Sequence, residues 1–91
     1  MAQRHKSAIK RHRQSLKRAD SNRVVRTHVR RVVRELRETI ARKELDDAQR
    51  QLQGVMKTVN QAVTKGVLHR NNAARRIARL SSQVTALRKA S

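Results

Sequence analysis

Residues 24–40 read VVRTHVRRVVRELRETI, and this stretch decides the fold. Its large apolar residues recur at the i, i+3 and i+4 spacing that is typical of one buried helix face. They are Val25, Val29, Val32, Val33, Leu36 and Ile40. No Gly or Pro interrupts the chain from Ser7 to Ala41, and strong helix formers are common there. The sequence therefore predicts one long helix from Ser7 to about Ala41, with a second half that packs against other elements.

A second helix is predicted after Arg42-Lys43-Glu44, where the apolar phase of the first helix ends. Its apolar positions are Leu45, Ala48, Leu52, Val55, Met56, Val59 and Val63. Acidic residues at 44, 46 and 47 suit the positive N-terminal end of a helix. Gly54 sits inside this helix, where it favours the close approach of a neighbouring helix, whereas Gly66 is a typical residue just beyond a helix end.

The third predicted helix follows a short loop, and Asn71 is its expected N-cap. Its apolar positions are Ala73, Ile77, Leu80, Val84 and Leu87. Three helices joined by short connections predict an all-α fold, a three-helix antiparallel bundle with a long, basic first helix that extends beyond the core.

The charge of the chain is extreme and unevenly distributed. The 91 residues include 24 Lys and Arg but six Asp and Glu, for a net charge of +18. All six acidic residues lie within residues 20–47, and only two of the Val, Ile and Leu residues, Ile9 and Leu16, precede Val24. We expect one domain, with a basic N-terminal arm at residues 1–23 that is continuous with the first helix, and the bundle at residues 24–91. A polyanionic partner would relieve the self-repulsion of such a chain.

Other functional classes find little support in the composition. There is no Cys, the four His are not at metal-motif spacing, and the two Gly form no phosphate-binding loop. We therefore expect no enzyme, no cofactor, no metal site and no small-molecule substrate. No apolar run approaches the ~20 residues of a membrane span, and the first residues lack the apolar stretch of a signal peptide. The expected location is the cytoplasm, and no homo-oligomer is expected.

Arginines flank the apolar stripe of the first helix. At about 100° per residue, five of them fall within a sector of roughly 80°. This arginine rail consists of Arg23, Arg26, Arg30, Arg34 and Arg37. Glu35 and Glu38 point elsewhere and are expected to pair with Arg31 and Arg34 at i, i+4 spacing. A solvated helix face is the alternative, but such faces usually mix charges of both signs.

Two further basic regions are candidate binding sites. The arm carries seven basic and no acidic residues before Asp20, and it is interpreted either as a segment ordered by phosphates or as a disordered tail. The loop–helix cluster, residues 65–76, brings cations, two Asn side chains and a helix N-terminus together. Its alternative interpretation is a pair of ordinary helix caps.

The lack of aromatic residues narrows the kind of nucleic-acid binding. Single-strand readers stack bases on Phe, Tyr or Trp, and this chain has none. Binding through phosphates, sugars and shape is expected, and arginine-rich surfaces suit a folded RNA. A DNA-binding or nucleoid-associated protein is the main alternative, although a second helix of about 20 residues is too long for a helix-turn-helix. A protein adaptor should carry mixed charges on its polar face.

Two motifs carry a family resemblance. Residues 65–76 read KGVLHRNNAARR and, with Leu80, closely resemble the KG-x-[LI]-H-[KR]-N-x-A-A-R signature of the bacterial small-subunit ribosomal protein family numbered twenty. Lys6-Ser7-Ala8-x-Lys10-Arg11 with Gln14 and Lys17 resembles the opening of the same family. The likeness covers nearly the whole chain, with departures at residues 18–22, where the family is more basic, and at residues 42–47.

The resemblance implies a three-helix structural component of the small ribosomal subunit that binds 16S ribosomal RNA early in assembly. Its partners would be that RNA and the small subunit, and it would lie on the ribosome in the cytoplasm. The residues expected to contact RNA come from the arm, the rail, the loop–helix cluster and the third helix. They are Lys6, Ser7, Lys10, Arg11, Arg13, Gln14, Lys17, Arg18, Asn22, Arg23, Arg26, Arg30, Arg34, Lys65, His69, Arg70, Asn71, Asn72, Arg75, Arg76 and Arg79.

Overall fold

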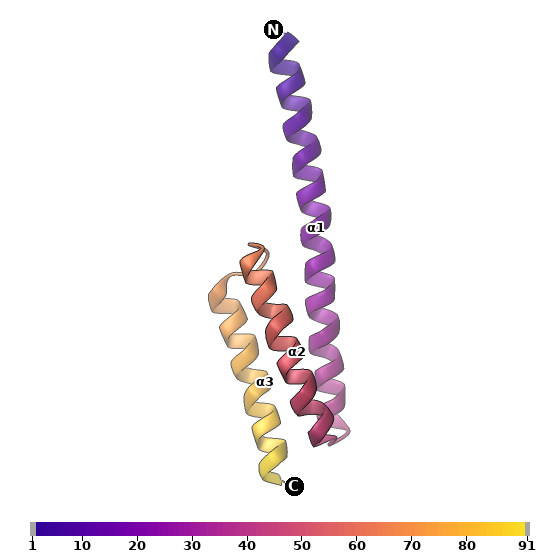
Figure 1. Cartoon of the computed structure of the whole chain (residues 1–91), viewed down its shortest axis with the longest axis vertical. Coiled ribbons are helices and arrows are strands. Elements are labelled where there is room, and N and C mark those ends of the chain that lie inside the picture. Colours follow the sequence, from indigo (N-terminus) through magenta and orange to yellow (C-terminus); the bar gives the residue numbers. More distant parts are fainter. Residues whose placement is uncertain (1, 91) are drawn as a thin grey trace.

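The computed structural model describes the backbone of residues 2–90 and the side chains of residues 8–90. Over this range it contains three helices, α1 (Ala2–Ala41), α2 (Leu45–Thr64) and α3 (Arg70–Ala90). Each helix runs antiparallel to the one before it (Figure 1). The predicted all-α, antiparallel bundle is confirmed, and the first helix begins at Ala2, before the expected Ser7.

Helix α2 lies in the middle of the bundle. It packs against both α1 and α3, whereas α1 and α3 touch each other only sparsely. The N-terminal half of α1 projects beyond the bundle, and the molecule measures 70 × 21 × 14 Å (Figure 1). Every side chain from Ala8 to Ser21 is exposed, because no other helix reaches this segment.

The core is thin and built mainly from the predicted apolar stripes. Leu36, Val59 and Leu80 are almost completely buried, one from each helix. The other buried apolar residues are Val29, Val33, Ala48, Val55, Ala62, Val67, Ala73 and Val84. Thr39 is the buried polar residue among the described side chains, and its hydroxyl donates to the Glu35 carbonyl at 3.0 Å and accepts from Arg42 at 3.3 Å.

The turn between α1 and α2 has a shape that Gly usually provides. Lys43 adopts a left-handed φ of 60°. Its N–H donates to the Ile40 carbonyl at 2.9 Å, and the Glu44 N–H donates to the Thr39 carbonyl at 3.2 Å. These two bonds make a Schellman motif, which satisfies carbonyl groups at the end of α1. The motif allows α2 to start at Leu45, with Asp46 and Asp47 in its first turn as predicted.

The α2–α3 connection begins with the same motif, here with Gly66 at a φ of 75°. The Gly66 N–H donates to the Val63 carbonyl, and the Val67 N–H donates to the Ala62 carbonyl, both at 2.9 Å. Val67 is buried, so its side chain anchors the loop to the core. The prediction that Gly66 ends the second helix is confirmed.

The prediction that Gly54 marks a close helix approach is wrong. Gly54 is exposed, and a Cβ atom added there would meet nothing within 4 Å. Its lack of a side chain therefore serves no packing purpose within the bundle.

Candidate nucleic-acid interface

The arginine rail is solvent-exposed along its whole length on α1. Three of its members lie on the side of α1 that is nearest to α3 and line hollows between α1 and α3: Arg26, Arg30 and Arg37. Arg23 and Arg34 lie farther around α1. The rail thus forms one wall of a groove and continues from there onto open surface.

The groove between α1 and α3 consists of two adjoining hollows. One is lined by Val33, Arg37, Asn72, Arg75, Arg76, Arg79 and Leu80. The other is lined by Arg26, Val29, Arg30, Val67, Leu68, His69, Asn72 and Arg76. Both include Asn72 and Arg76, which therefore lie at the junction of the two hollows. Buried apolar side chains contribute to the lining, and six arginines from two helices surround it.

Acidic residues are absent from the lining of this groove. Ion pairs formed by Arg42 with Glu44 at 3.2 Å and by Arg50 with Asp47 at 3.7 Å lie away from the groove. No carboxylate of the groove lining therefore offsets the charge of these arginines. A phosphate entering the groove would meet cations from both sides.

The predicted pairing of Glu35 with Arg31 and of Glu38 with Arg34 is not formed between these described side chains. Instead, Arg31 Nη2 donates to His28 Nδ1 at 2.9 Å. Exposed helix pairs of this type are worth only a few tenths of a kcal/mol, so solvation competes with them readily. Glu35 and Glu38 were predicted to point away from the arginine rail, and neither lines the groove that three rail arginines help to form.

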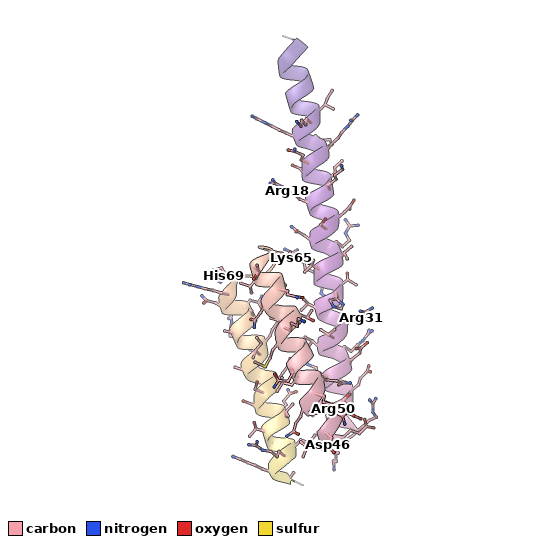
Figure 2. The ribbon with its side chains drawn as sticks, viewed as in Figure 1. Arg18, Arg31, Asp46, Arg50, Lys65 and His69 are labelled. Atoms are coloured by element: carbon pink, nitrogen blue, oxygen red, sulfur yellow. The ribbon has the colours of Figure 1, made fainter. Side chains whose placement is uncertain are left out.

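The loop–helix cluster lies at the end of the bundle that faces the projecting part of α1 (Figure 2). Lys65, His69 and Arg70 are exposed there. His69 Nδ1 accepts the backbone N–H of Asn71 at 3.1 Å, and the His69 carbonyl accepts the N–H of Ala73 at 3.1 Å. His69 is therefore the N-cap of α3, and the prediction that Asn71 holds this position is wrong.

Two arginines near the start of α3 donate hydrogen bonds to different kinds of acceptor in its first turn. Arg76 Nε donates to the side-chain Oδ1 of Asn72 at 3.0 Å, and both residues are half-buried. Arg75 Nε donates to the backbone carbonyl of Asn71 at 3.4 Å, and both are exposed. Arg79, one turn farther along, is exposed and lines the groove.

The side chains predicted to bind from the arm are exposed along the projecting part of α1. They are Lys10, Arg11, Arg13, Gln14, Lys17 and Arg18. Asn22 is half-buried, where α1 meets the bundle, and the side chains of Lys6 and Ser7 lie outside the described residues. At about 100° per residue, the arm cations are centred on roughly the opposite side of α1 from the rail. Figure 2 shows Arg18 on the side of α1 that carries the other two helices, and Arg31 on the far side.

The structure thus joins two regions that sequence reasoning kept separate. Three rail arginines of α1 and three arginines of α3 line one groove, whereas the arm is a distinct exposed surface. The groove could not be read from the periodicity of either helix, because periodicity does not say on which side of α1 the third helix packs. The role of His69 as a cap was also missed, since His is an uncommon N-cap residue.

Neither a membrane-spanning helix nor a metal-binding cluster is present among the described residues. Between residues 2 and 90, no helix has both the length and the apolar character needed to span a membrane. No cluster of three or more His, Asp or Glu side chains within residues 8–90 is placed to hold a metal ion.

Comparison with known proteins gives a consistent result. A family model described as ribosomal protein S20 matches residues 3–85. The small ribosomal subunit protein bS20 of Oleidesulfovibrio alaskensis is 46% identical over 80 residues, which cover 88% of this chain and 92% of that protein. The bS20 protein of Helicobacter hepaticus is 41% identical over 88% of this chain and 89% of its own length. That of Syntrophobacter fumaroxidans is 40% identical over 91% of this chain and 96% of its own length.

Proposed function

This chain belongs to the ribosomal protein S20 family, a structural family of the small ribosomal subunit, and from this premise we propose that it binds 16S ribosomal RNA directly. It is a non-enzymatic ribosomal component, and its place is on the ribosome in the cytoplasm. Phosphate and sugar contacts hold the RNA, and these contacts stabilise the RNA fold during assembly of the subunit.

The observation that carries the proposal is the groove between α1 and α3. Six arginines line it without a carboxylate, and each guanidinium can bridge two phosphate oxygens. Arginines on opposite walls would repel one another in the free protein, so an RNA backbone between them removes an unfavourable interaction and adds favourable ones.

The other predicted contacts extend this surface. In the proposal, the arm of residues 1–23 acts as a separate binding segment, while residues 24–91 form the bundle that presents the groove. Lys65, His69 and Arg70 contact RNA at the bundle end, and Asn71 and Asn72 lie beside them. Cations on different sides of α1 suit a helix that is surrounded by RNA rather than laid on one flat surface.

The test is a comparison of two double variants in binding to a 16S ribosomal RNA transcript. Arg30→Ala with Arg79→Ala removes one cation from each wall of the groove. Lys57→Ala with Lys89→Ala removes the same charge from exposed positions of α2 and α3 outside it. The groove variant should bind at least tenfold more weakly than the control variant at physiological salt, because only its lost charges face phosphates.

Equal affinity of the two variants would contradict the groove as the binding surface. A DNA duplex of similar length provides the second comparison, because net charge alone would favour both polyanions equally. If the full chain bound DNA as tightly as the 16S transcript, the alternative of a DNA-binding or nucleoid-associated protein would be correct.

A further inference from the structure

We propose that Asn72 is a positioning residue, which holds the guanidinium of Arg76 at the centre of the α1–α3 groove so that it meets an RNA phosphate already oriented. This inference rests on the proposed function, since it concerns how the same groove binds RNA. Asn72 acts through Arg76 and does not itself contact the phosphate.

Asn72 and Arg76 lie at a position where a restraint on the Arg76 side chain affects both hollows of the groove. Asn72 and Arg76 line both of its hollows. Arg76 Nε donates to Asn72 Oδ1 at 3.0 Å across one helical turn, the i, i+4 spacing at which side chains of a helix meet. One of the five N–H groups of Arg76 is engaged in this way, so four remain for a ligand.

The surrounding charges explain why Arg76 needs to be held. Arg75 and Arg79 lie on the same helix, and Arg26, Arg30 and Arg37 line the groove from the facing helix. Like charges would drive an unrestrained arginine outward into solvent. The Asn72 amide is a neutral acceptor, so it restrains Arg76 and leaves the positive charge intact. A carboxylate at this position would hold the same Nε but would cancel the charge.

The neighbouring pair offers a matched control. Arg75 is also held through its Nε by a residue one turn earlier, but its acceptor is the backbone carbonyl of Asn71. Asn71→Ala therefore leaves the acceptor of Arg75 in place, whereas Asn72→Ala removes the acceptor of Arg76. Both variants exchange an Asn for Ala in the same turn of α3.

A double-mutant cycle on the full chain tests the coupling, with a 16S ribosomal RNA transcript as the probe. Asn72→Ala alone should weaken binding by about three- to tenfold, the cost of immobilising one long side chain on binding. In an Arg76→Ala background the same change should have no effect, whereas any effect of Asn71→Ala on affinity should be the same in both backgrounds. A loss from Asn72→Ala that persisted without Arg76 would overturn the inference and show direct contact with RNA.

A measurement on the free protein keeps this inference separable from the proposed function. The Nε–H NMR signal of Arg76 should exchange slowly with water in the parent and in Asn71→Ala, and rapidly in Asn72→Ala. Equal exchange in parent and Asn72→Ala would refute the positioning role, whatever the chain binds. If the exchange differed as expected but the parent bound the 16S transcript no better than duplex DNA, the proposed function would fail while the restraint on Arg76 stood.

Discussion

The start of α3 depends on His69, whose imidazole and carbonyl both accept backbone N–H groups of the first turn. Asn is the commoner N-cap residue, so the pattern of residue types favoured Asn71. The loop decides otherwise: with Val67 buried after the turn at Gly66, the chain becomes helical at Arg70. Asn71 then lies inside the first turn, where its backbone N–H needs an acceptor from the preceding residues.

Replacing His69 by Ala should lower the free energy of unfolding by about 1 kcal/mol, because one N–H at the helix start loses its acceptor. Asn71→Ala should change it by much less, and His69→Ser should restore the cap. Urea unfolding of the free protein, followed by circular dichroism at 222 nm, measures all three. A larger loss from Asn71→Ala than from His69→Ala would show that the cap has been assigned to the wrong residue.

At the scale of elements, the predicted helices agree with the structure, whereas the connections agree only in part. The apolar stripes identify the buried faces because each helix has one side turned to the core. The turn after α1 was located only from the end of the apolar phase, because Lys43 occupies a left-handed position that Gly would normally mark. Gly54 was misinterpreted because a Gly inside a helix suggests close packing by a neighbour, whereas here nothing packs against it.

Gly54→Ala should therefore stabilise α2 and raise the free energy of unfolding by up to about 1 kcal/mol, through helix propensity alone. Gly66→Ala is the control. It should lower the same quantity by about 1 kcal/mol, because an Ala at a φ of 75° is strained. Thermal and urea unfolding of both variants measure whether each substitution raises or lowers the free energy of unfolding. A destabilised Gly54→Ala protein would mean that a neighbour does approach this position.

The arm is the element whose stability differs most from the rest. Its helix has no buried face between Ala8 and Ser21, and helices without tertiary packing are marginal in water. In the free protein, amide hydrogens of residues 10–18 should exchange much faster than those of Val55 and Val59 in α2. Binding of 16S RNA should slow the arm amides at least tenfold. Slow exchange from residues 10–18 without RNA would contradict this view of the arm.

At the scale of the whole molecule, the high net charge is related to the small core and the open groove. A chain with a net charge of +18 builds a small core of mostly Val, Leu and Ala, and it leaves a groove rather than a closed contact between α1 and α3. Composition was enough to predict a polyanionic partner, and the motifs at residues 6–17 and 65–76 were enough to predict the family. Predicting the groove would have required the three-dimensional packing, because the arginines of its two walls are separated by more than thirty residues in sequence.

The salt dependence of binding to a 16S ribosomal RNA transcript tests most directly the claim that cations on phosphates hold the RNA. If about ten of the basic residues contact phosphates, log K should fall against log salt concentration with a slope of about −7 to −9. Arg30→Ala with Arg79→Ala should make that slope shallower by about 2, one unit for each lost phosphate contact. A parent slope shallower than about −3, or an unchanged slope in the groove variant, would contradict the phosphate-dominated interface.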